Sequence, residues 1–179
     1  SQKFNLKIFD AIVTPAQDNC SVRVFFSRSK KIRETVRLKK LLEYEKKNKI
    51  NTYSSSKRYE TKVKNSWKIL RQELLKLKKN NKTIVAYGAS AKSGTISRCA
   101  NLGKDIIDFF IDDSPSKQGL YTPIYNIPIL SKKEGYKKKI DYLLILAVNY
   151  ADIIIKKEKN FKINGGKFII PRGEYIEYV

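Results

Sequence analysis

The sequence predicts an α/β fold: a Rossmann-like parallel sheet flanked by helices, preceded by a helical linker and by two strands of another domain. Two observations predict this fold. Beyond Thr83, short apolar runs rich in β-branched residues alternate with helical patterns, which is typical of a parallel sheet covered on both faces. At residues 84–99 a strand, a glycine turn and a helix follow one another directly, as in nucleotide-binding α/β units.

Residues 1–29 are predicted to form two strands, Leu6–Val13 and Ser21–Ser27, joined by a loop at Pro15–Asn19. Two strands alone do not make a stable sheet, so their apolar faces need a further sheet or a partner. An unpaired sheet edge of this kind favours a homodimer or cover by another part of the protein. We therefore expect this segment to be what is left of a truncated N-terminal domain.

Residues 30–80 are predicted to be a helical linker. Its first helix, Lys30–Lys49, is strongly charged, and a polar break at Asn51–Ser56 follows. The second helix, Lys57–Lys79, carries one apolar stripe at steps of three and four residues, with Trp67 as its anchor in a core. The pair is expected to brace two domains, and a dimer interface is the alternative.

Residues 81–179 are predicted to form the Rossmann-like domain. Its expected strands are Ile84–Tyr87, Ile106–Ile111, Ile127–Leu130, Asp141–Ala147 and Lys167–Ile170. Its expected helices are Thr95–Leu102, Lys132–Lys138 and Tyr150–Phe161.

Composition excludes several classes of protein. The chain has no histidine and two cysteines, so neither a histidine-based nucleophile scheme nor a four-ligand zinc site of the usual kind can be built from it. Sparse cysteine fits a reducing cytoplasm. No apolar run approaches the roughly 20 residues that a membrane span needs, so no membrane partner is expected. The net charge of +21 makes nucleic-acid binding an alternative, but the lysines are spread along the chain and no nucleic-acid-binding motif accompanies them.

The turn that begins at Gly88 is the candidate binding site. We expect the helix to resume near Ser93–Thr95, where unpartnered N–H groups, the helix dipole and the Lys92 ammonium favour a phosphate or pyrophosphate. A plain strand-to-helix turn is the alternative. The pattern is not a P-loop, and of the glycines in the dinucleotide fingerprint it keeps only the first.

Ligands of such sheets bind beyond the carboxyl ends of the strands, so four segments are expected to converge on one crevice. They are Gly88–Lys92, Asp112–Lys117, Val148–Asn149 and Pro171–Arg172. Asp112 stands about where a ribose-binding acid follows a dinucleotide turn, which makes NAD binding a second alternative. A turn-forming role before Ser114 is the alternative for Asp113.

Several motifs, in the same order, resemble the C-terminal domain of bacterial SAM-dependent sugar C-methyltransferases, which act on dTDP-linked deoxy-keto sugars. They are Gly88–Thr95, Asp112–Pro123, Ile127–Ile129, Leu143–Asn149 and Gly165–Pro171. The resemblance implies that residues 30–80 are the family's linker and that residues 1–29 are the last strands of its methyltransferase domain.

The resemblance also implies a nucleotide-sugar substrate and roles for individual residues. The turn from Gly88, with Lys92 and the backbone of Ala89, Ser90 and Ala91, would contact the diphosphate. Thr95 would cap the helix or bind phosphate, and Asp113, Lys117 and Asn149 would line the crevice.

The resemblance further implies SAM and a structural zinc for the full-length parent. Nothing in this sequence matches the family's SAM-binding loop, zinc cysteines or catalytic tyrosine and histidine. The chain is therefore expected to hold no cofactor itself, to work with an N-terminal SAM-binding domain, and to be catalytically silent alone.

Overall fold

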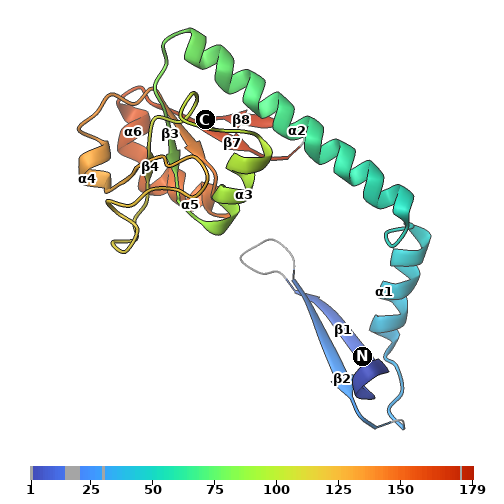
Figure 1. Cartoon of the computed structure of the whole chain (residues 1–179). Coiled ribbons are helices and arrows are strands. Elements are labelled where there is room, and N and C mark those ends of the chain that lie inside the picture. Colours follow the sequence, from blue (N-terminus) through green and yellow to red (C-terminus); the bar gives the residue numbers. More distant parts are fainter. Residues whose placement is uncertain (1, 15–20, 30, 174) are drawn as a thin grey trace. The chain divides into compact units, whose positions relative to one another are not determined.

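The computed structural model describes the chain except residues 1, 15–20, 30 and 174 (Figure 1). The expected loop at Pro15–Asn19 therefore lies outside the described residues. The chain divides into two compact units, Ser1–Tyr59 and Glu60–Val179, and the division falls inside helix α2 (Tyr53–Lys79). The three-part division expected from the sequence stays a prediction. In the described parts of the chain, no helix is both long and apolar enough to cross a membrane.

The first unit contains a β-hairpin, which confirms both expected strands. After a short 3-10 helix, η1 (Gln2–Phe4), strand β1 (Lys7–Thr14) pairs antiparallel with β2 (Ser21–Ser27) through a register that is interrupted by a bulge next to Asp10. Three apolar side chains of β2 remain exposed, those of Val22, Val24 and Phe26. Cover of this strand by a second copy or another domain stays a prediction.

Asp10 fastens the hairpin to the start of helix α1 (Val36–Lys47). Its carboxylate pairs with the Arg37 guanidinium and accepts hydrogen bonds from the Thr35 hydroxyl and the Ala11 amide. Thr35 is also the N-cap of α1, and its amide donates to the carbonyl of Phe9 at 2.9 Å. The Arg37 and Thr35 hydrogen bonds hold the pKa of Asp10 below its ordinary value of 3.8, although partial desolvation acts in the opposite direction.

The depressed pKa predicts an acid-sensitive junction. Because the pKa of Asp10 is lower in the folded chain, the stabilisation is present above pH 3.8 and is lost as pH falls through the lower folded value. We expect hydrogen exchange at the Thr35 amide, corrected for its intrinsic pH dependence, to accelerate in that acidic window. Asp10→Asn should exchange fast already at neutral pH and show no acidic transition. An identical transition in the variant would contradict the role of Asp10.

The second unit is built on a six-stranded sheet with the order β5-β4-β3-β6-β7-β8. The first five strands are parallel and β8 runs antiparallel to β7. This confirms the Rossmann-like parallel sheet. The strands are β3 (Ile84–Tyr87), β4 (Phe110–Ile111), β5 (Ile129–Leu130), β6 (Tyr142–Ile145), β7 (Lys167–Pro171) and β8 (Ile176–Tyr178).

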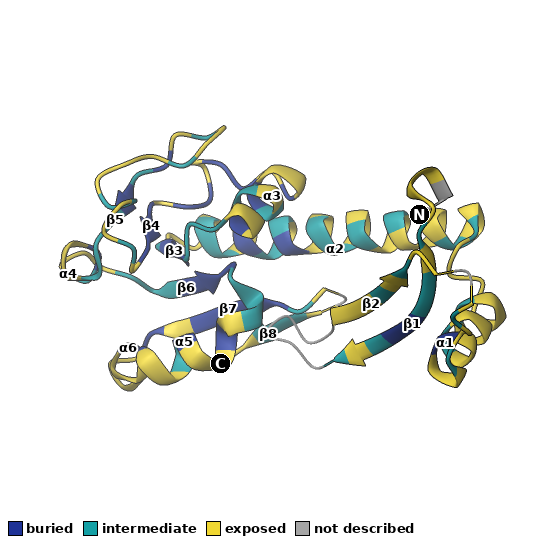
Figure 2. Ribbon diagram, turned by 90° about the horizontal axis from the view of Figure 1, so that it is seen from below, coloured by how far each residue is buried: buried dark blue, intermediate teal, exposed yellow. Residues whose placement is uncertain are grey.

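Helices cover both faces of this sheet (Figure 2). Because side chains alternate along a strand, Ile84 and Ala86 face one layer, which contains Leu70 and Leu74 of α2 and the apolar side of α3 (Ala91–Cys99). Alternate residues of the same strands pack with the other layer, which includes α5 (Ala151–Lys157), α6 (Lys159–Ile163) and residues next to α4 (Lys132–Gly135). Trp67 packs against the first layer, as expected.

Several expected elements are shorter than the sequence predicts: the strand expected over Ile127–Leu130 covers Ile129–Leu130, and the helix expected over Lys132–Lys138 ends at Gly135. The strand expected over Ile106–Ile111 is confirmed at Phe110–Ile111 and wrong before it, because the amides of Ile106 and Ile107 both donate to the carbonyl of Gly103 and form a turn. The helix expected over Tyr150–Phe161 is divided at Glu158, whose backbone leaves the helical region, into α5 and α6. A 3-10 turn, η2 (Val148–Tyr150), precedes them.

Leu74 tests how strongly α2 is anchored to the sheet. Its side chain is fully buried, so Leu74→Ala should lower the free energy of unfolding by about 2–5 kcal/mol. Ile69→Ala, on an exposed position of the same helix, should change it by about 0.5 kcal/mol. Urea unfolding followed by circular dichroism measures both, and equal losses would contradict the anchoring role of Leu74.

Candidate functional site

The turn after β3 lies at the switch point of the sheet. From β3 the chain continues to β4 on one side, whereas from β6 it continues to β7 on the other, and ligand crevices of α/β sheets form where the order reverses. Gly88 has a φ of +90°, and a Cβ there would lie 3.1 Å from the Cβ of Ala147, which follows β6. The glycine therefore lets the two strand ends come close together. Asn149, in η2, belongs to the β6 side of this point.

Ser90, and not Thr95, caps helix α3. Ser90 has an extended backbone, its side chain accepts a hydrogen bond from the Ser93 amide at 3.2 Å, and the helix begins at Ala91. The expectations that the helix starts near Ser93–Thr95 and that Thr95 caps it are wrong, whereas phosphate binding by Thr95 stays a prediction. The Thr95 hydroxyl donates to the carbonyl of Ala91 inside the helix. Lys92 consequently lies in the first helical turn.

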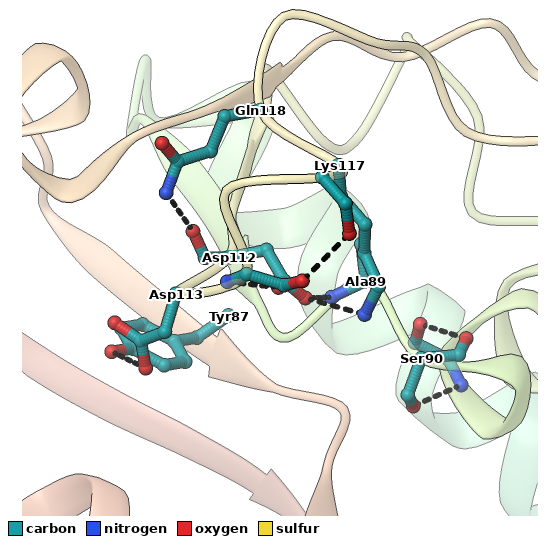
Figure 3. Close-up of polar contacts among 10 residues, drawn as sticks. Tyr87, Ala89, Ser90, Asp112, Asp113, Lys117 and Gln118 are labelled. Atoms are coloured by element: carbon teal, nitrogen blue, oxygen red, sulfur yellow. Dashed lines mark hydrogen bonds and ion pairs between the residues drawn. The ribbon is translucent and has the colours of Figure 1, made fainter.

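Asp112 binds the turn directly (Figure 3). Its Oδ2 accepts a hydrogen bond from the Ala89 amide at 2.6 Å and lies 3.3 Å from the Lys117 ammonium. Its Oδ1 accepts from the Ser114 amide at 2.8 Å, and the side chain is buried. An anionic oxygen of the chain itself therefore occupies one amide of the predicted phosphate site. In the NAD alternative Asp112 would bind ribose, whereas here its carboxylate oxygens accept hydrogen bonds from the amides of Ala89 and Ser114.

Asp113 belongs to a different cluster, although it is the next residue. The Tyr87 hydroxyl lies 3.0 Å from its Oδ2 and the Lys157 ammonium lies 2.6 Å from the same oxygen. Burial raises the pKa of Asp113, but the hydrogen bonds from Lys157 and Tyr87 outweigh it and hold the pKa below its ordinary value. Of the predicted crevice residues, the structure thus brings Lys117 to the turn and places Asp113 with Tyr87.

A small cavity of about 50 Å³ adjoins the turn, and part of its lining was not predicted. Ser97 lies on it with a buried hydroxyl that has no hydrogen-bond partner within the described residues. The signal in the sequence is the spacing of Ser90, Ser93 and Ser97 at three and four residues, which places three hydroxyls on one side of α3. The cavity is lined by Ala89, Ser90, Ser93, Gly94, Ser97, Phe110, Thr122, Pro123 and Ile129.

The cap assignment can be tested by stability. Ser90→Ala removes the acceptor of the Ser93 amide and should lower the free energy of unfolding by about 1 kcal/mol. Thr95→Ala removes a hydroxyl within the helix and should have a smaller effect or none. Denaturant unfolding compares them. A larger loss of stability from Thr95→Ala than from Ser90→Ala would contradict Ser90 as the cap and favour Thr95.

The mostly parallel sheet, with the N-terminus of α3 at its switch point, identifies the second unit as a Rossmann-like α/β domain. Within this class, the chain matches the family of the C-methyltransferase C-terminal domain over residues 19–172, and it belongs to that family. The resemblance drawn from the motifs is thereby confirmed.

Among curated proteins, a stretch of 92 residues is 41% identical to the C-methyltransferase NovU of Streptomyces niveus. This stretch spans 51% of the chain and 22% of that relative. Among solved structures, UDP-D-quinovosamine 4-dehydrogenase from Vibrio fischeri matches with a TM-score of 0.39 and 18% identity. That match covers 55% of this chain and 93% of the dehydrogenase chain.

Proposed function

We propose that this domain binds the nucleotide part of a nucleotide-linked deoxysugar and presents the sugar to a SAM-dependent C-methyltransferase domain. Family membership supports the methyltransferase context. The observation that carries the proposal is the N-terminus of α3, which begins at Ala91, directly after the turn at the switch point of the sheet. The Ala89 amide is already taken by the Asp112 carboxylate at 2.6 Å, so a diphosphate would be held by other donors of this turn and helix.

The start of α3 supplies the further donors. The amides of Ala91 and Lys92 come in the first turn of the helix, before the intrahelical acceptors begin, and the dipole of α3 adds partial positive charge there. The Lys92 ammonium adds a full charge. Lys117 already offsets the charge of Asp112, so that the carboxylate does not cancel the attraction of Lys92 for a diphosphate.

The chemistry of methyl transfer is assigned to the N-terminal part of the parent enzyme. SAM would supply the methyl group there. The structural zinc would also be bound there, because the described residues contain no cluster of three or more metal-ligating side chains. We therefore propose that this domain binds and orients the substrate, contributes no catalytic residue and shows no turnover with SAM by itself. Sparse cysteine is consistent with a cytoplasmic enzyme.

Isothermal titration of the chain with dTDP, NAD and a short DNA duplex at about 150 mM salt tests the proposal. We expect dTDP to bind, and Lys92→Ala to weaken it by about tenfold because a charged contact to phosphate is lost. Lys104→Ala is the matched control, since this exposed lysine follows the opposite end of α3.

The other titrants separate the alternatives. Binding of NAD in place of dTDP would favour a dinucleotide site, and Asp112→Ala would then weaken it. DNA binding that falls steeply with salt would favour a nucleic-acid interface. Absence of dTDP binding, or equal losses in Lys92→Ala and Lys104→Ala, would contradict the phosphate site at α3.

A further inference from the structure

A second cavity lies on the sheet face opposite α3. Its volume is about 370 Å³, within the range of about 300–1,000 Å³ typical of small-molecule sites. It is formed by the α4 region, the end of α5, α6 and the start of β7, and it shares no lining residue with the turn at Gly88. The lining residues are Lys132, Tyr136, Lys138, Ile140, Lys157, Glu158, Asn160, Phe161, Asn164 and Gly166.

The inner wall of this cavity is a polar cluster around Glu158, which is 3% exposed. Its carboxylate accepts hydrogen bonds from the hydroxyls of Tyr87 at 3.0 Å and Tyr136 at 2.9 Å, and it pairs with the Lys132 ammonium at 2.8 Å. Burial, together with the charge of Glu158, raises the pKa of both phenols, which therefore stay protonated as donors. The carboxylate oxygens of Glu158 thus bind donors of the protein itself.

The charges around the cavity leave it positive. Lys157 lies 2.6 Å from Asp113, and Lys132 lies 2.8 Å from Glu158, so that two of the three lining lysines face one carboxylate each. The Lys138 ammonium is 5.9 Å from the centroid of the Phe109 ring. With these two carboxylates counted, the lysines still provide one positive charge in excess. Each ammonium also has three N–H donors, more than its single named ion pair uses.

We propose that this cavity binds a small phosphorylated organic molecule. The donors are three lysines, which act as point charges on an oxyanion, and the side-chain amides of Asn160 and Asn164. The cavity is larger than a phosphate group needs, and Phe161 and Ile140 provide an apolar surface for a short carbon skeleton. This site is independent of the nucleotide site proposed at α3, because the two lie on opposite faces of the sheet.

Amide NMR of the labelled chain tests the site, with glucose 6-phosphate, glucose and inorganic phosphate as probes. We expect glucose 6-phosphate to shift the amides of Lys138, Asn160 and Asn164 in a saturable manner. Glucose should not shift them, and inorganic phosphate should bind more weakly because it lacks the carbon skeleton. Titration of dTDP, followed at the amides of Ala89–Lys92, reports separately on the nucleotide site.

Two variants on exposed positions keep the test independent of folding. Lys138→Gln should raise the Kd for glucose 6-phosphate by about tenfold, and Asn164→Asp, which adds a negative charge to the wall, should raise it at least as much. Lys137→Gln is the matched control, because this exposed neighbour makes the same charge change outside the cavity. Equal losses in Lys137→Gln and Lys138→Gln, shifts confined to Ala89–Lys92, or no saturable shift at the cavity would each overturn the proposal.

Discussion

The buried carboxylate of Asp112 is the interaction on which the geometry of the turn after β3, the proposed nucleotide site, depends. It joins the end of β4 to the turn after β3 through the Ala89 amide, and it fixes the following loop through the Ser114 amide and Lys117. A carboxylate in a buried position is stabilised only when donors replace its water, and here three do so. The loop, the turn and the start of α3 are therefore held in one arrangement by one side chain.

Two neighbouring residues that directly follow β4 join different polar clusters. Asp112 turns toward Ala89, on the side of α3, whereas Asp113 joins Tyr87 and Lys157 on the side of α5. In the same way Tyr87 faces the second layer although the next residue, Gly88, opens the turn. A two-layered sheet of this kind can carry one polar site on each face without sharing side chains between them.

The sequence predicts best the elements whose position depends on burial of apolar side chains alone. Runs buried on both faces, such as Ile84–Tyr87 and Phe168–Ile170, are recognisable from their apolar residues, and the structure confirms the strands expected there. The cap of α3 is not recognisable in this way, because Ser90, Ser93 and Thr95 are all residue types that can cap, and Ser93 at the third helical position gives no capping-box signal. The position of Asp113 depends on contacts with Tyr87 and Lys157, from distant segments, which spacing along the chain does not encode.

A single phenol proton links the two carboxylates of the second layer. The Tyr87 hydroxyl lies 3.0 Å from both Asp113 and Glu158, yet it has one hydrogen to donate. Lys157 and Tyr136 supply further donors, to Asp113 and Glu158 respectively, and Lys132 adds a positive charge at Glu158. The positive charges of Lys132 and Lys157 are thus balanced by the carboxylates of Glu158 and Asp113. The net attraction of the second cavity for an anion comes from the one positive charge that remains. This is why a variant at Lys138, which leaves the wall intact, separates ligand binding from folding.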